Sequence, residues 1–508
     1  MRQLEPFRWD FATFKVHGAL PASGDVRPDF RVHGTACRGR RVGDPYTREG
    51  TDTMARPRIV VVGAGFAGVA CVRRLERTLS PGEAEILLVT PFSYQLYLPL
   101  LPQVASGVLT PQSVAVSLRR SRRHRTRIVP GGAVGVDTRA KVCIIRKITG
   151  ELVDQPYDRL VLAPGSVTRT FDIPGLAEHG RGMKTLAEAA HLRDHVIAQL
   201  DLADAAAPGS AERASRLGFV VVGGGYAGTE TAASLERLTA NAVGRYPRLD
   251  GREISWHLVD VAPKLMPELG DRLGRAALDV LRRRGIEVSL GASVAKAGPE
   301  DVTLTDGRVL PCRTLIWTAG VAASPLIATL GAETAKSGRL VVAPDLRVPG
   351  ADGAFALGDA AAVPDLAGGG DGAVCPPTAQ HAERQGKVAA DNVVATLRGT
   401  PLRPYAHKDL GLVVDLGGRD GVSRPLGIDL RGMPAQAVAR GYHWAALRTG
   451  AAKTRVLTNW LLNAVAGDDF VRTGFQTYKP GTLRDFEYTN HYLTPEEVRA
   501  RTVSHGAG

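Results

Sequence analysis

The fold follows from residues 58–68, which read Arg58-Ile59-Val60-Val61-Val62-Gly63-Ala64-Gly65-Phe66-Ala67-Gly68. The first five residues, mostly β-branched aliphatics, are typical of a buried parallel strand, and the pattern then predicts a helix from Phe66 to about Leu79. The first two glycines allow the backbone to bend and to approach a pyrophosphate, and the last lets the helix pack on the strand. Because the helix N-terminus also offers free N–H groups, the stretch indicates a dinucleotide-binding turn.

A second copy of this pattern occupies residues 219–228, where three valines precede Gly223, Gly225 and Gly228. Two such turns in one chain indicate two dinucleotides. The strand that follows the second turn is expected over 253–260 and ends in Asp260, whose carboxylate would accept from both ribose hydroxyls and repel a 2′-phosphate. This favours NADH over NADPH. After the first turn, the corresponding strand ends in Thr90, which has a hydroxyl but no charge.

Charge and size limit the classes of partner. The chain has 508 residues, a net charge of +13 and 44% hydrophobic residues, which predicts a globular protein of several domains with anionic partners. The densest basic run is at 117–125, and it is either a solvated face or a surface for anionic lipid headgroups. Few aromatic residues interleave with its arginines, which argues against nucleic acid.

The five cysteines are far apart, at Cys37, Cys71, Cys143, Cys312 and Cys375. Since no Cys-x-x-Cys pair is present, we expect neither a metal site nor a redox-active disulfide, and the compartment is predicted to be reducing. No apolar run reaches the roughly 18 to 20 residues of a membrane-spanning helix, and no signal-peptide core is seen at the N-terminus. Residues 1–56 are predicted to be a flexible extension without a catalytic role, unless Met54 is the true start.

Two later segments resemble a known superfamily. Residues 157–166 end in Ala163-Pro164-Gly165-Ser166, and residues 353–359 end in Gly358-Asp359. Together with the two turns, they resemble the flavoprotein disulfide-reductase-like superfamily with two dinucleotide-binding domains. The resemblance implies FAD at the first turn, a nicotinamide nucleotide at the second, and Asp359 at the ribityl chain.

A third segment, residues 375–387, carries the finer resemblance. Its prolines predict a helix start with free N–H groups that can stabilise a reduced flavin. Pro377-Thr378-Ala379-Gln380 and the residues after it resemble the signature of type II NADH dehydrogenases, the single-chain NADH:quinone oxidoreductases. Arg384 departs from that signature, and Gln385 follows it.

The resemblance implies an enzyme that passes hydride from NADH to FAD and two electrons to a membrane quinone, menaquinone or ubiquinone, without proton pumping. A sulfide:quinone oxidoreductase and an NADH-binding flavoprotein that signals or scaffolds are the alternatives. The implied catalytic residues are Glu230, Gln380 and Gln385, and the implied quinone contacts are Tyr94, Tyr97, Gln380 and Arg384. The implied FAD contacts are Gly63, Gly65, Gly68, Thr90, Ala163, Gly165, Gly358, Asp359, Ala379 and Gln380, and those of NADH are Gly223, Gly225, Gly228, Glu230, Asp260 and Gly320.

Some of these residues have plainer explanations. The apolar segment from Tyr94 to Gly107 is either core packing or a wall beside a flat cofactor or a lipid-like substrate. Glu230 is either a residue that positions NADH or relays protons, or an acid of the kind favoured at helix N-termini.

The C-terminal third contains a predicted amphipathic helix over 455–465. Its apolar face would carry Val456, Leu457, Trp460, Leu461, Ala464 and Val465. Such a helix lies in the lipid headgroup region, or packs on its own domain or on a second subunit of a homodimer. The resemblance favours an anionic membrane surface, at the cytoplasmic face of the plasma membrane.

The expected fold class is α/β, with two Rossmann-like domains and a C-terminal membrane-docking region. The expected order is an extension at 1–56, the FAD-binding domain at 57–170 and 341–400, the NADH-binding domain at 171–340, and a docking or dimerisation region at 401–508.

Overall fold

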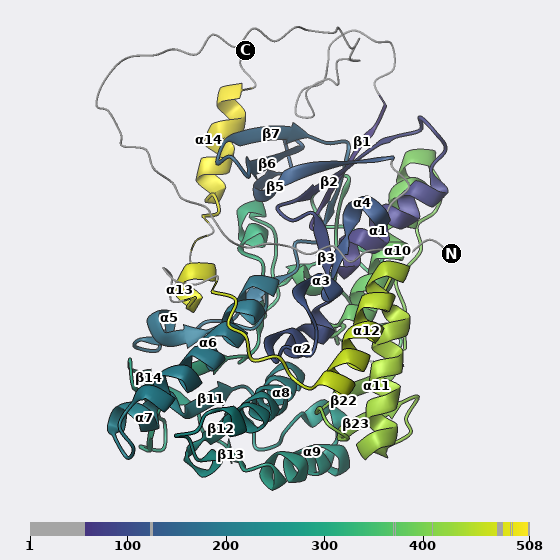
Figure 1. Ribbon diagram of the computed structural model, residues 1–508. Coiled ribbons are helices and arrows are strands. Elements are labelled where there is room, and N and C mark those ends of the chain that lie inside the picture. Colours follow the sequence, from purple (N-terminus) through teal and green to yellow (C-terminus); the bar gives the residue numbers. More distant parts are fainter. Residues whose placement is uncertain are drawn as a thin grey trace, which may run out of the picture. The chain divides into compact units, whose positions relative to one another are not determined.

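The structure is a computed structural model that describes residues 56–121, 125–368, 370, 372–408, 410–474, 481–487, 489 and 491–505. Cys37, almost all of the predicted N-terminal extension and the centre of the basic run lie outside these residues. The described chain is an α/β protein with two main sheets, one mixed and one parallel, and each contains the strand that precedes one of the two glycine turns (Figure 1).

The first sheet is formed by seven strands in the order β20-β8-β1-β2-β5-β6-β7. Its first five strands are parallel, and Val60 of β1 lies between Leu87 of β2 and Leu160 of β8. β20 comes from late in the chain, so the sheet is completed by a segment about 190 residues beyond β8. The strands are β1 (Arg58–Val62), β2 (Glu85–Thr90), β5 (Thr126–Asp137), β6 (Val142–Lys147), β7 (Leu152–Pro156), β8 (Arg159–Leu162) and β20 (Ala354–Ala356).

Two long helices pack against each other beside this sheet, α1 (Phe66–Thr78) and α10 (Ala379–Arg398) (Figure 1). The contact is close because Gly386 has no side chain: a Cβ there would lie 2.3 Å from the Ala67 carbonyl oxygen. The helix predicted from Phe66 is confirmed, since α1 begins at that residue. The packing brings two distant parts of the sequence together at one site.

The second sheet contains five parallel strands in the order β10-β17-β11-β12-β13. The predicted strand at 253–260 begins only at Ser255, because residues Gly251–Glu253 form a 3₁₀ turn capped by Asp250. Helices α6 (Leu186–Ala205), α8 (Tyr226–Ala242) and α9 (Asp271–Arg283) belong to this half. The strands are β10 (Gly180–Arg181), β11 (Gly218–Val222), β12 (Ser255–Asp260), β13 (Ile286–Leu290) and β17 (Thr314–Trp317).

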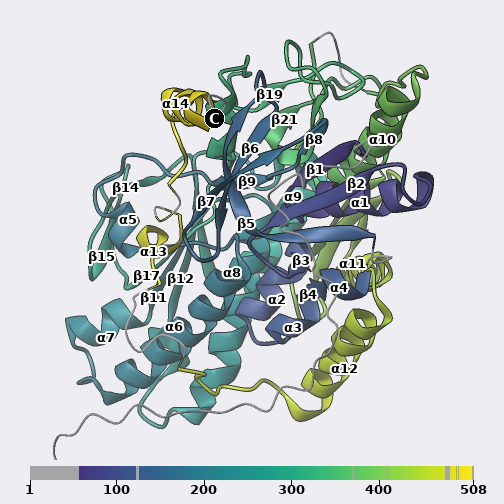
Figure 2. The same cartoon turned by 90° about the horizontal axis from the view of Figure 1, so that it is seen from above.

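The C-terminal region separates into pieces with different neighbours, and Figure 2 shows α12 and α14 far apart. A small sheet of β22 (Gly411–Asp415), β23 (Gly421–Pro425) and β24 (Leu430–Arg431) precedes α11 (Gly432–Ala446) and α12 (Gly450–Ala466). α12 contacts α3 (Pro111–Val114), whereas α14 (Pro495–His505) contacts β5. Within the described ranges, we find no helix with the length and apolarity needed to cross a bilayer.

The predicted apolar face of α12 is divided between the interior and the surface. Val456 is fully buried, and the Trp460 indole donates to Gln103 Oε1 at 2.8 Å. Leu461 and Val465 are instead 59% and 88% exposed. One stripe of the helix therefore anchors it, and the neighbouring stripe remains free.

Candidate functional site

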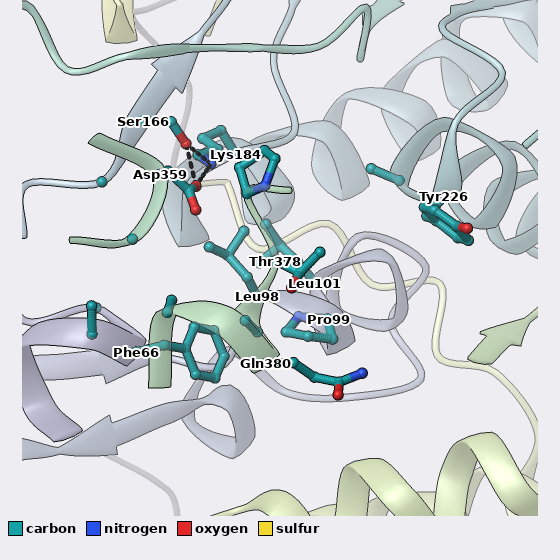
Figure 3. A pocket seen from close by; sticks show the side chains of 18 of the residues that line it. Phe66, Leu98, Pro99, Leu101, Ser166, Lys184, Tyr226, Asp359, Thr378 and Gln380 are labelled. Carbon is teal, nitrogen blue, oxygen red and sulfur yellow. Dashed lines mark hydrogen bonds and ion pairs between the residues drawn. The ribbon is translucent and has the colours of Figure 1, made fainter. Parts of the chain in front are cut away.

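A cavity of about 490 Å³ lies where the two glycine turns face each other. Both turns contribute to it, since Gly65 lines one side and Tyr226 and Glu230 line another. Figure 3 shows Leu98, Pro99 and Leu101, which form an apolar wall between Phe66 and Tyr226. The other lining residues come from the strand ends and helix starts around the cavity and include Ala163, Gly165, Ser166, Lys184, Gly358, Asp359, Thr378, Ala379, Gln380, Leu412, Val413, Tyr442 and His443.

The first turn leaves room for a ligand at the start of α1. Gly63 has φ +95°, and a Cβ there would lie 2.1 Å from the Ala163 carbonyl oxygen. Gly65, by contrast, has nothing within 4 Å of its Cβ position. It is the N-cap of α1, and because glycine has no side chain it cannot cap the first N–H groups of the helix. The first N–H groups of the helix are thus free to receive a phosphate.

The second turn repeats this arrangement at the start of α8. Gly225 is the N-cap, again without a side-chain cap and with open space at its Cβ position. Asp260 lies beside the turn, where its carboxylate accepts from the Gly224 N–H and from the Ala262 N–H at 2.7 Å. The structure therefore brings the predicted acid to the predicted turn.

One end of the cavity holds a polar cluster around Asp359 (Figure 3). Ser166 donates to the Asp359 carboxylate at 2.6 Å, and Lys184 Nζ donates to Ser166 Oγ at 2.8 Å. The ammonium of Lys184 is also 3.9 Å from that carboxylate. The sequence predicted Asp359 but missed Lys184, which lies in a loop without a motif and meets Asp359 only through the fold.

Glu230 lies in the wall of the cavity and is partly buried. Its Oε1 accepts a hydrogen bond from the Asp415 N–H at 2.9 Å. The pKa of Glu230 is raised to about 8, mainly by loss of solvent and to a smaller extent by the neighbouring Asp415 carboxylate, against the lowering effect of that hydrogen bond. The carboxyl group is therefore largely protonated at neutral pH. It can donate this proton to a group bound in the cavity.

His443 is a lining residue that sequence reasoning did not find. Its Nδ1 lies 3.1 Å from the Tyr97 hydroxyl, and burial lowers the pKa of the imidazole to about 4. A neutral histidine thus faces the cavity, and the predicted quinone contact Tyr97 lies behind it, 5% exposed. A lone histidine in an alanine-rich helix gave no signal in the sequence.

The start of α10 places Gln380 at the cavity. Gln380 Nε2 donates to the Gly411 carbonyl oxygen at 2.9 Å, and Oε1 accepts from the Leu410 N–H at 3.3 Å. Gln385 does not line the cavity: it is buried behind it and accepts from the Gly358 N–H at 2.8 Å. Gln385 therefore supports the loop that carries Asp359.

Several predicted contacts lie away from this cavity. Tyr94, Arg384 and Gly320 are not among its lining residues. Arg384 donates to the carbonyl oxygen of Gln380, a lining residue, at 3.1 Å. The Thr90 hydroxyl is bonded to the backbone of Phe92, at 3.2 Å and 3.3 Å, instead of facing open space.

A second cavity of about 360 Å³ continues from the other side of the first turn. It is lined by Gly63, Phe92, Arg146 and Lys147, and it shares Pro164 with the main cavity. An elongated dinucleotide that crosses Gly65 would reach both spaces.

The four cysteines among the described residues form no disulfide with one another. Cys71, Cys143, Cys312 and Cys375 are buried, and burial raises the pKa of Cys143 and Cys312 to about 12. None of these four lines the main cavity. Within the part of the chain that the structure describes, no group of three His, Cys, Asp or Glu residues is placed to hold a metal ion.

Comparison with known proteins agrees with this geometry. The family model described as pyridine nucleotide-disulphide oxidoreductase matches residues 57–386. Type II NADH:quinone oxidoreductase NdhA of Mycobacterium tuberculosis is 33% identical over 335 residues, which cover 63% of this chain and 69% of that protein. The Ndh protein of the same organism, with the same description, is 29% identical over 421 residues, covering 80% of this chain and 87% of the relative.

Among solved structures, NDH2 from Plasmodium falciparum in complex with NADH has a TM-score of 0.75. The match covers 82% of this chain and all of that chain at 18% identity, and so it supports the fold. Taken together with the two opposed turns, these matches show that the chain belongs to the pyridine nucleotide-disulphide oxidoreductase family, among the type II NADH:quinone oxidoreductases.

Proposed function

We propose that this protein oxidises NADH and reduces a membrane quinone, with FAD as its bound cofactor. The observation that carries the proposal is the single cavity lined by both nucleotide-binding turns, through Gly65 on one side and Tyr226 and Glu230 on the other. Two flat rings held at these turns would meet inside one apolar space, which is the arrangement that hydride transfer between them requires.

The residues around the first turn fit FAD. The open Cβ position of Gly65 and the free N–H groups of α1 suit its pyrophosphate, and the cluster of Ser166, Lys184 and Asp359 offers donors and acceptors to a polyhydroxyl chain. The start of α10 at Ala379 directs its N–H groups toward the same cavity, where they favour negative charge. When bound, FAD supplies the two-electron chemistry that links NADH to the quinone.

The residues around the second turn fit NADH. Gly225 leaves the helix start open to its pyrophosphate, and the Asp260 carboxylate favours a ribose with free hydroxyls over one with a 2′-phosphate. The neutral carboxyl of Glu230 would lie beside the nicotinamide or the quinone and can supply a proton there. Gly320 is a further proposed contact in this half.

We propose that the quinone enters along the apolar wall formed by Leu98, Pro99, Leu412 and Val413. Gln380 and His443 offer polar groups at its far end, although the Gln380 amide is also bonded to the backbone at 410–411. Tyr97 would act on the quinone through His443. No direct contact with Tyr94 or Arg384 is needed in this arrangement.

The exposed stripe of α12 is the proposed membrane contact, with the protein peripheral at the cytoplasmic face. Leu457, Leu461 and Val465 are exposed on one side of α12, and Lys453 and Arg455 add positive charge that suits anionic lipids. Exposed apolar side chains on neighbouring turns of a helix are typical of a membrane or protein contact. A homodimer would use the same face.

The docking surface is tested by flotation with vesicles of phosphatidylcholine and phosphatidylglycerol. The double variant Leu461→Glu and Val465→Glu should lose at least tenfold in vesicle binding, because it places two charges in the apolar contact. The control Val309→Glu and Val503→Glu, at other exposed positions, should bind as the wild type does. If the first variant instead turns a dimer into a monomer by light scattering and still binds vesicles, the stripe is a subunit contact.

The reaction itself is tested by anaerobic stopped-flow absorbance. NADH should bleach the flavin band rapidly, NADPH should do so much more slowly, and a menaquinone analogue should then restore the band. A flavin that sulfide bleaches and NADH does not would identify a sulfide:quinone oxidoreductase. NADH binding without bleaching would indicate a signalling or scaffold role.

A further inference from the structure

A separate cavity of about 420 Å³ lies between the C-terminal half of α1 and the middle of α10. It shares no lining residue with the cavity between the two glycine turns. Its lining residues are Ala70, Arg73, Arg74, Arg77, Lys387, Asp391, Arg403 and Arg448. Six of these eight are cationic and one is acidic.

The acidic groups at this cavity are already engaged. The Asp391 carboxylate pairs with Arg74 at 2.6 Å and with Arg403. Glu383, about two turns before Asp391 on α10, pairs with Lys387 at 2.9 Å and with Arg448 at 2.8 Å. The two carboxylates thus serve four of the six cations.

The remaining two cations are Arg73 and Arg77, and within the described residues neither forms an ion pair. Burial lowers the pKa of Arg73, the nearby charges of Arg448 and Arg77 lower it further, and the Glu383 and Glu76 carboxylates act in the opposite direction. Because Arg73, Arg77 and Arg448 line one cavity, their guanidinium groups repel one another there. A net positive cavity of this kind is stabilised when an anion enters it.

We propose that this cavity binds an anion that carries one or more phosphate groups. Arginine presents a planar fork of N–H donors that matches the oxygens of a phosphate, and five of the six cations here are arginines. A water molecule occupies about 30 Å³ in the liquid, so the cavity has room for an anion of several heavy atoms.

The phosphate has two possible sources, a soluble anion and a lipid headgroup. Arg448 lies in the short link between α11 and α12, so the cavity adjoins the helices that we propose as the membrane contact. Binding of a soluble phosphate compound does not depend on the proposed membrane contact. Binding of a lipid headgroup rests on that proposed function. Pyrophosphate and lipid vesicles, used as separate probes, distinguish the two ligands.

The test uses the full-length, FAD-loaded protein and isothermal titration calorimetry with inorganic pyrophosphate at constant ionic strength. The double variant Arg73→Gln and Arg77→Gln removes the two unpaired cations and should weaken pyrophosphate binding at least tenfold. The matched control is Arg245→Gln and Arg282→Gln, which removes the same charge from two exposed arginines outside the cavity and outside the basic run at 117–125, and it should bind as the wild type does. Flavin content and NADH-dependent bleaching report that each variant is folded.

Vesicles of phosphatidylcholine with phosphatidylglycerol identify the source. If the Arg73/Arg77 variant also binds vesicles less well than the control, and pyrophosphate competes with the vesicles, a lipid phosphate occupies the cavity. If vesicle binding is unchanged, a soluble phosphate ligand does. The proposal is overturned if wild-type protein binds neither probe, or if the two double variants lose the same affinity for pyrophosphate.

Discussion

Glu230 and His443 show how burial sets the protonation of single residues around the proposed site. Both lie in the cavity wall, and in each case loss of solvent favours the neutral form: the pKa of the acid rises to about 8, and that of the imidazole falls to about 4. At neutral pH the part of the wall formed by Glu230 and His443 therefore carries little charge, whereas the ion pair of Lys184 and Asp359 lies at one end of the cavity. The neutral part suits two uncharged rings, a nicotinamide in its reduced form and a quinone.

The raised pKa of Glu230 predicts how stability depends on pH. The folded protein holds the proton until about pH 8, whereas the unfolded chain releases it near the ordinary value of 4.5. Between these values the free energy of unfolding of the wild type should fall, relative to Glu230→Gln, by up to about 1.4 kcal/mol per pH unit. Chemical denaturation from pH 4 to pH 9 measures it.

The exposed Glu268→Gln provides the control for this experiment and should show no such slope. If the free energy of unfolding changes with pH in the same way in Glu230→Gln and in Glu268→Gln, then Glu230 is ionised in the folded protein at neutral pH, and the prediction is wrong.

The hydrogen bond between Tyr97 and His443 predicts a selective effect on the quinone. Tyr97→Phe should lower stability by about 1 kcal/mol and raise the KM for a menaquinone analogue. It should leave flavin bleaching by NADH unchanged, because Tyr97 itself does not line the cavity. Steady-state and stopped-flow kinetics separate the two effects.

Tyr94→Phe is the matched control, since Tyr94 is half-buried in a short strand, β3 (Tyr94–Leu96), and does not line the cavity. A slower flavin reduction in Tyr97→Phe would assign the tyrosine to the NADH side instead.

At the scale of elements, each glycine turn combines a tight contact with an open helix start. Gly68 cannot carry a side chain, because its Cβ would lie 1.9 Å from the Gly63 carbonyl oxygen, whereas Gly65 has free space around it. The two glycines therefore serve different purposes on one turn. One lets α1 pack on β1, and the other lets a ligand approach.

This difference predicts opposite outcomes for two substitutions. Gly65→Val should fold with nearly wild-type stability but lose most of its FAD, because the new side chain fills the space of the pyrophosphate. Gly68→Ala should be destabilised by about 2 kcal/mol or more through steric overlap. The flavin-to-protein absorbance ratio and the melting temperature of the apoprotein give the two readouts, and full FAD content in Gly65→Val would contradict the assignment.

At the scale of the whole molecule, segments from late in the sequence complete the first sheet and cover part of it. β20 completes the first sheet beside β8, and α14 covers β5, where Val498 is 2% exposed in a cluster with Val134 and Ile144. Arg501 also pairs with Asp154 at 2.6 Å. The C-terminal helix is therefore a structural part of the first half and not of the proposed docking surface.

We accordingly predict that Val498→Asp lowers the free energy of unfolding by about 3 kcal/mol, because it buries an unpaired charge. Vesicle binding should be unaffected in the protein that remains folded. Val503→Asp, on the same helix but 73% exposed, should change stability little. Thermal unfolding measures both, and equal melting temperatures would place α14 free of the sheet.

The sequence alone determined the local elements and the type of site. The strand at 58–62, the helix from Phe66, both glycine turns and Asp260 were predictable because their signals lie within a few consecutive residues. Only the tertiary structure decided which side chains meet. Lys184 reaches Asp359, His443 reaches Tyr97, and Arg73 faces Arg448 because packing joins segments more than 100 residues apart, and no local pattern encodes such contacts.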